Sequence, residues 1–297
     1  MENGELYKNR GVGATLSAAY NKFTSEFKPI FRHLWKSASL FAVGLAAFQV
    51  LTLTDITHNP VLLGFMGLVS LFFIAAYCFF CSHLAKYVNA ETWKWNLKRV
   101  VKIFLLELLF GVLVSAVAVL VTLAIIKSIS PNGIDPQLFI VTLAAVTLIV
   151  VILAYLLYLP INYGEMKYLM EPTAKFKSIV GAYYRVGLRH WGYQFLTHLV
   201  LGLVVLIMSL VVNFPITIVN LASAIAMQGM AAGDVAELPG SFLWIVGLVS
   251  LITFFASAFI SVFSFFVHYF IYGSIEQREK ERAEARRLND LEIAEEA

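Results

Sequence analysis

The sequence predicts an all-α, polytopic membrane protein with six transmembrane helices. Two observations predict this fold class. Of the 297 residues, 60% are hydrophobic and only 14% are charged, whereas soluble domains usually carry about 25% charged residues. In addition, six apolar runs of roughly 20 residues recur, which is the length that crosses a hydrocarbon layer of about 30 Å. This recurrence favours helices in lipid over the large core of a soluble helical protein.

The spans are expected at residues 36–53, 61–81, 103–126, 137–159, 193–219 and 242–272. The last two runs are longer than a perpendicular helix needs, so tilting or bending is expected there. Pro215 predicts a kink in the fifth span, because proline removes a backbone donor and its ring clashes with the preceding turn.

The basic residues predict the orientation of these spans. All but one of the 22 lysine and arginine residues precede the first span, follow the last, or lie between spans two and three or four and five. The exception is Lys127, and the three other loops instead carry Asp55, Asp135, Asp234 and Glu237. Cytoplasmic loops retain Lys and Arg, so both ends of the chain are expected in the cytoplasm. No removable signal peptide is expected, because the first 36 residues lack a short apolar region and a small-residue cleavage site.

The chain also has the pattern of three similar units, at residues 12–89, 90–172 and 173–273. Each begins with an amphipathic segment expected to form an interfacial helix on the cytoplasmic face, at residues 14–27, 90–101 and 174–188. Each returning span follows a proline, at Pro60, Pro136 and Pro239. The alternative is that ordinary membrane hairpins share such features. The three units would together form one transmembrane domain, residues 1–273, followed by a charged cytoplasmic tail, residues 274–297.

Polar residues inside the spans are the candidate functional residues. Glu107, His198, His268 and Asn162 are all expected about 6 Å below the cytoplasmic surface, from their distance to the span ends at about 1.5 Å per residue. Ionisable groups at such positions are costly and indicate a functional site; the alternative is that these side chains reach back to the headgroups. We expect Glu107 to face the bundle interior near His198 or His268. Asn213 and Asn220 lie deeper and are expected to form hydrogen bonds between helices.

Few motifs point to chemistry. Cys78 and Cys81 form a C-x-x-C pattern, but it is expected at the end of a helix, where the dipole opposes the thiolate, so both are interpreted as small apolar packing residues. The sequence has no nucleotide-binding loop, no metal-ligating set and no nucleophile motif. Neither a cofactor, a bound metal nor a nucleic-acid partner is therefore expected. Membrane lipids are the expected partners, with a possible protein partner at the tail.

Two stretches resemble a known group of proteins. The first is Glu5-Leu6-Tyr7-Lys8-Asn9-Arg10-Gly11-Val12-Gly13, and the second is Phe27-Lys28-Pro29-Ile30-Phe31-Arg32-His33-Leu34-Trp35. They resemble six-span bacterial inner-membrane proteins that are in turn similar to the membrane domain attached to some glycerophosphodiester phosphodiesterases. The likeness covers the general layout of the chain. The soluble barrel that carries catalysis in those enzymes is missing here, so the resemblance implies only a bacterial inner-membrane location and an envelope-related role.

Three functions remain open on these observations. The first is a non-enzymatic membrane protein that organises lipid or binds partner proteins. The second is a transporter of a small molecule or lipid, with a cytoplasm-facing polar site at Glu107, His198, His268 and Asn162. The third is a membrane-embedded enzyme, for which the sequence offers no nucleophile.

Overall fold

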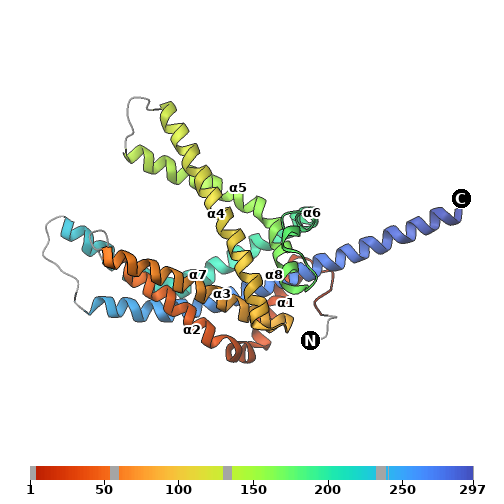
Figure 1. Cartoon of the computed structure of the whole chain (residues 1–297), viewed down its shortest axis with the longest axis horizontal. Helices are drawn as coiled ribbons and strands as arrows, with labels where there is room; N and C mark the ends of the chain where they lie inside the picture. Colours follow the sequence, from red (N-terminus) through yellow and green to blue (C-terminus); the bar gives the residue numbers. More distant parts are fainter. Residues whose placement is uncertain (1–4, 54–59, 130–135, 232–238, 240, 297) are drawn as a thin grey trace. The chain divides into compact units, whose positions relative to one another are not determined.

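The computed structural model of the chain describes residues 5–53, 60–129, 136–231, 239 and 241–296. These residues form α-helices joined by short connections (Figure 1). The helices are α1 (Val12–Ser25), α2 (Phe27–Thr52), α3 (Pro60–Asn89), α4 (Trp93–Ile129), α5 (Pro136–Met170), α6 (Ala182–Arg189), α7 (Trp191–Ala231) and α8 (Phe242–Glu296), with a 3₁₀ turn at Phe176–Ser178.

Six of the described helices are long and apolar enough to cross a membrane: α2, α3, α4, α5, α7 and α8. Two of the turn prolines begin helices, Pro60 in α3 and Pro136 in α5, where the missing N–H would have no helical partner. The all-α, multi-pass fold expected from the sequence is therefore confirmed.

The helices fall into two compact units. Unit 1 comprises Met1–Leu97 and Thr197–Ala297, and unit 2 comprises Lys98–Leu196. The three repeat units proposed from the sequence, and the single domain that they would form, stay a prediction.

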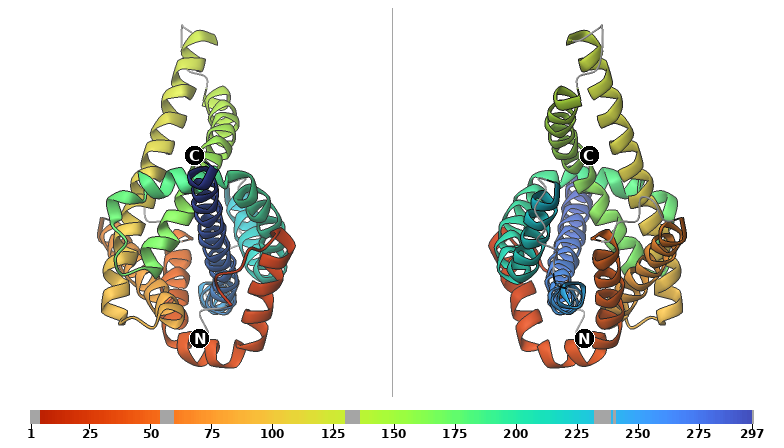
Figure 2. Two further views of the ribbon diagram at one scale, coloured as in Figure 1. Left: turned by 90° about the vertical axis from the view of Figure 1, so that its right-hand side faces the viewer. Right: turned by 90° about the vertical axis from the view of Figure 1, so that its left-hand side faces the viewer.

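In unit 1, α2 packs against both α3 and α8, and α1 packs against α8 (Figure 2). Small residues on α2 allow this close approach, because Ala38, Ala42 and Gly44 are all buried. A Cβ atom added to Gly44 would lie 3.1 Å from the Cα of Phe73 on α3. Small residues at such contacts are how membrane helices gain packing energy, since lipid supplies no hydrophobic force between them.

A phenylalanine stripe joins α1 and α2 to α8. Phe23 contacts Phe263, Phe27 contacts Phe259, and Phe31 stacks on Phe259, with ring centroids 6.2, 5.9 and 5.5 Å apart. The residues recur every four positions on both sides, so each set lies along one helix face.

In unit 2, α5 continues through Pro160 to Met170, beyond the expected end of the fourth span at residue 159. Proline at position 160 has no N–H for the carbonyl of Leu156, four residues earlier. The indole Nε1 of Trp191 donates to that carbonyl at 3.0 Å. A side chain from α7 thus supplies the missing hydrogen bond, so the helix does not need to end.

The amphipathic segments differ from one another. The first forms a separate helix, α1, as expected. The second is not a separate helix, because residues from Trp93 onward are the first turns of the continuous helix α4. The third forms the 3₁₀ turn and the short helix α6.

Residues 5–10, called here the N-terminal strap, lie across α8 near the start of the tail. A Cβ atom added to Gly273 would overlap the backbone oxygen of Leu6 and lie 2.8 Å from its Cγ. Arg278 donates from Nε to the side chain of Asn9 at 2.9 Å and from Nη2 to the carbonyl of Arg10 at 2.7 Å. The tail itself continues α8 without a break (Figure 1).

Candidate functional site

Two carboxylates in unit 2 lie within range of each other's charge. Glu107 on α4 is close enough to Glu165 on α5 for the two charges to interact. Glu165 is only 7% exposed, and the hydroxyl of Tyr158 donates to its Oε1. Charged groups in membrane helices are costly and mark functional sites by default. This carboxylate pair is therefore a candidate polar site among the described residues of unit 2.

The continuation of α5 creates this site. Tyr158 and Glu165 are seven residues apart, so they share one face of α5 only because the helix runs through Pro160. The ring of Tyr158 also packs against Phe110 of α4, with centroids 4.9 Å apart. The aromatic contact holds the hydroxyl beside Glu165.

The two candidate histidines meet in unit 1. The rings of His198 on α7 and His268 on α8 lie with their centroids 5.0 Å apart. His198 is buried and His268 is half-buried. Glu107 belongs to the other unit, so its expected approach to either histidine stays a prediction.

The remaining candidates lie in different places. Asn162 lies within α5 and is half-buried. Helix α7 runs through Pro215 without ending, and the kink expected there stays a prediction. Two interhelical hydrogen bonds expected from the sequence are confirmed: Gln49 donates to Asn220 at 3.0 Å, and the Ser257 hydroxyl lies 3.4 Å from the Asn213 oxygen.

The C-x-x-C pattern lies inside α3 rather than at its end, since the helix runs on to Asn89. Neither thiol is part of a disulfide bond, and Cys78 is buried. The described residues contain no group of three or more His, Cys, Asp or Glu side chains placed to hold a metal.

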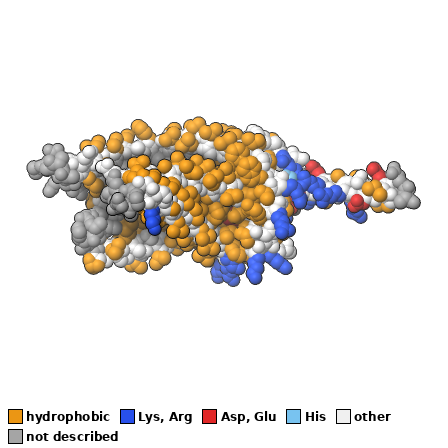
Figure 3. Space-filling model, turned by 90° about the horizontal axis from the view of Figure 1, so that it is seen from above, with side chains coloured by type: hydrophobic (Ala, Val, Ile, Leu, Met, Phe, Trp, Pro, Cys, Tyr) orange, Lys and Arg blue, Asp and Glu red, His pale blue; other side chains and the backbone are white. Residues whose placement is uncertain are grey.

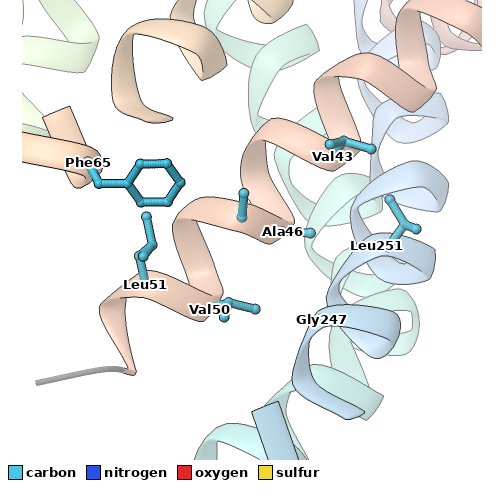
Figure 4. A pocket seen from close by; sticks show the side chains of 8 residues that line it. Val43, Ala46, Val50, Leu51, Phe65, Gly247 and Leu251 are labelled. Carbon is cyan, nitrogen blue, oxygen red and sulfur yellow. The ribbon is translucent and has the colours of Figure 1, made fainter. Parts of the chain in front are cut away.

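An apolar groove lies between α2, α3 and α8 in unit 1 (Figure 4). Its volume is about 340 Å³, within the range of about 300–1,000 Å³ typical of ligand sites. All the residues that line it are apolar or glycine: Val43, Ala46, Ala47, Val50, Leu51, Phe65, Gly247 and Leu251. They lie near the C-terminal end of α2 and near the N-terminal ends of α3 and α8, so the groove is at one end of these three spans.

A charged cluster lies at the other end of α2, where α1 and α2 meet. The hydroxyl of Tyr87 donates to Glu26 at 2.6 Å, and Lys22 donates to both carboxylate oxygens at 3.0 and 3.2 Å. Burial raises the pKa of Glu26, but the hydrogen bonds from Tyr87 and Lys22 and the charge of Lys22 outweigh it. The pKa of the Glu26 carboxyl is therefore held below its ordinary value.

Sequence reasoning missed Glu165, Tyr158 and Glu26. Glu165 falls beyond the fourth span expected from the sequence, residues 137–159, and was therefore not considered as a polar residue of a span. The sequence signal for this pair is the spacing of seven residues between Tyr158 and Glu165, which places both on one helix face. This signal is informative only if α5 continues through Pro160.

Comparisons with known protein families, with curated proteins and with solved structures found no match. The likeness to the membrane domain of glycerophosphodiester phosphodiesterases therefore stays an expectation. The site must be interpreted from the geometry of this chain alone.

Proposed function

We propose that this multi-pass membrane protein is a non-enzymatic organiser of membrane lipid, and that the groove between α2, α3 and α8 holds an acyl chain. The groove is the observation that carries the proposal. Its lining has no charged residue, and it lies in helices that cross the membrane. A polar ligand would gain nothing from such a lining, whereas an alkyl chain gains van der Waals contact along its length.

The position of the groove defines the lipid. With both termini in the cytoplasm of a bacterial inner membrane, the end of α2 and the starts of α3 and α8 face outward. The occupant would then be a phospholipid of the outer leaflet, whose chain enters between Val43 and Phe65. These two side chains are 45% and 52% exposed, so they border the open side of the groove.

Gly247 offers a direct test, because a Cβ at this position would meet only Val50 Cγ2, at 3.6 Å. Gly247→Leu should therefore fill the groove without displacing backbone. The matched control is Gly67→Leu on α3, where an added Cβ has no neighbour within 4 Å.

The experiment uses full-length protein in vesicles that contain a phospholipid with a photoreactive group in one acyl chain. Cross-links should concentrate on residues 43–51 and 247–251, and Gly247→Leu should reduce them several-fold while Gly67→Leu leaves them unchanged. Cross-links spread evenly over all lipid-exposed helices, or unaffected by Gly247→Leu, would rule the proposal out.

Transport through a cytoplasm-facing polar site is the second candidate, and the carboxylate pair favours it. Glu107 and Glu165 interact through their charges, and Glu165 is buried. Carboxylates placed in this way in membrane helices can carry protons or cations.

This candidate predicts proton movement through the protein. Vesicles loaded with the pH dye pyranine should lose an imposed pH gradient faster with wild-type protein than with Glu165→Gln or Glu107→Gln. Identical rates for wild type, both variants and protein-free vesicles would remove transport of this kind.

A further inference from the structure

One side of α2 carries a stripe of exposed basic residues. Lys28, Arg32 and Lys36 recur every four residues and are all exposed, so they lie along one line of the helix. At 3.6 residues per turn, this line is on the opposite side of α2 from Ile30 and Leu34, which are fully buried. The basic stripe therefore faces away from the core of unit 1.

Among the residues that the structure describes, no carboxylate pairs with the basic stripe. Helices α2 and α3 contain no Asp or Glu, and the first one in α8 is Glu276, in the tail. Red and blue side chains follow the tail in Figure 3. Glu26, just before α2, is already bonded to Lys22 and Tyr87. The stripe is thus a row of positive charge without a negative counterpart in the helices beside it.

The stripe lies at the level where the membrane surface is expected. Counted back from Thr52, the last residue of α2, a hydrocarbon layer of about 30 Å covers about 20 residues. Its edge then falls near Arg32, with Lys28 about 6 Å outside it and Lys36 about 6 Å inside it. A lysine at that depth can extend its ammonium group back to the headgroups. All three charges can therefore reach the phosphate layer.

Toward the middle of the membrane, this side of α2 becomes apolar. Trp35 is 43% exposed, and the Nζ of Lys36 lies 5.6 Å from the centre of its ring. Leu40, one turn deeper than Lys36, is 38% exposed. Tryptophan is favoured at the interface between headgroups and hydrocarbon. The order of cations, indole and aliphatic side chain matches the order of phosphate, glycerol and acyl chain in a phospholipid.

We propose that this side of α2 binds an anionic phospholipid, in the cytoplasmic leaflet if both termini are cytoplasmic. The guanidinium of Arg32, at the hydrocarbon edge, donates to the lipid phosphate, for which its planar fork of N–H groups is suited. Lys28 and Lys36 add positive charge above and below this contact. One acyl chain follows Trp35 and Leu40 into the membrane.

The charge and the depth of the surface both favour this occupant. Three cations attract a lipid with a net negative charge, whereas they repel the ammonium group of a zwitterionic lipid. A water-soluble acidic protein fits less well, because it would have to follow the surface below the hydrocarbon edge to meet Lys36 and Leu40. A second copy of this chain offers no carboxylate from its own α2 or α3 at this level.

This site is separate from the acyl-chain groove of the proposed function. The groove is lined by residues 43–51 of α2, at the other end of the helix, and its proposed occupant belongs to the opposite leaflet. An empty groove would leave the lipid site at the basic stripe unaffected. Cross-links at residues 35–40 and at residues 43–51 therefore test the two proposals separately.

The experiment uses full-length protein in phosphatidylcholine vesicles that contain one of two lipid probes. Both probes carry the same photoreactive acyl chain, but one has an anionic phosphatidylglycerol headgroup and the other a zwitterionic phosphatidylcholine headgroup. The measured quantity is the ratio of anionic to zwitterionic cross-links at residues 35–40. Division by the zwitterionic value corrects for any difference in how α2 inserts.

Wild type should give a ratio well above one. Arg32→Gln should lower it about fivefold, because each basic residue near an anionic lipid surface contributes about this factor. Arg32→Gln with Lys36→Gln should lower it further, whereas Arg32→Lys, which keeps the charge, should lose less than Arg32→Gln. The matched control is Arg282→Gln with Arg286→Gln, which removes two cations at the same spacing from the tail and should leave the ratio unchanged.

The wild-type ratio should also fall toward one at an ionic strength of about 1 M, where the Debye length is about 3 Å. A wild-type ratio of one, or equal ratios for wild type and the double variant in α2, would overturn the proposal. An equal fall in the tail control would overturn it too, because the preference would then come from the net charge of the protein. So would an amine-reactive reagent that joins Lys28 or Lys36 to a second copy or another protein while the lipid ratio stays at one.

Discussion

Replacing Gly273 by valine should release the N-terminal strap from α8. The new Cβ would overlap the Leu6 backbone oxygen, which no change of side-chain rotamer can relieve. The strap must then leave, and the Leu6 side chain, only 9% exposed, loses its burial. That loss is worth about 2 kcal/mol, which shifts the ratio of bound to released strap by about 30-fold.

Trypsin measures this shift, because Lys8 and Arg10 both lie in the strap. When opening is fast, cleavage follows the population of the open form, so Gly273→Val should be cut about 30 times faster than wild type. Leu6→Ala should act in the same direction without any clash on α8. Gly202→Val is the control, because a Cβ there has no neighbour within 4 Å. Equal cleavage of Gly273→Val and wild type would refute the reasoning.

Three further predictions concern other parts of the chain. Gly187→Ala should lower the stability of unit 2 by about 1–3 kcal/mol, because the added Cβ would press on the α5 backbone. Thermal unfolding measures this loss. Gly192→Ala should show no comparable loss, because a Cβ there has no neighbour within 4 Å. The pKa of Glu26 is lowered in the folded protein. The ionised carboxylate therefore stabilises the fold fully above the pKa of an unfolded Glu, about 4.3, and this stabilisation is lost as the pH falls through the lower pKa of the folded state. The protection factors of the α1 amides, which allow for the pH dependence of intrinsic exchange, should therefore fall on acidification in wild type but much less so in Glu26→Gln, and equal pH profiles would contradict this. In a chain without native cysteines, an external thiol reagent should label a cysteine at position 58, which lies outside the described residues, but not one at Lys175; labelling at 175 would reverse the orientation.

The spans were predictable because length and hydropathy are local properties of the chain. The same is true of the helix starts at Pro60 and Pro136, where proline fits the first turn. The end of α5 was not predictable in this way. Its passage through Pro160 depends on the Trp191 indole, which is 31 residues further along the chain, and no local pattern contains that contact.

For the candidate site, the sequence predicted only the depth of each residue in the membrane. Counting residues from the span ends gave Glu107 a depth, but depth does not say which way a helix faces. Within unit 2 the charge of Glu107 interacts with that of Glu165, while the expected approach of Glu107 to His198 or His268, which belong to unit 1, stays a prediction. His198 and His268 were chosen for the same depth, and their rings do meet, because the helix faces that carry them also point toward each other.

The unbroken course of α8 makes the tail a lever arm. From Ser274 to Glu296 the helix extends about 33 Å, and the strap holds only its first turns. A change of about 10° in the tilt of the sixth span would move the far end by about 6 Å at this length. Because helices tilt to match the thickness of the bilayer around them, thinning or thickening of the membrane would be amplified into a larger displacement of the far end of the tail.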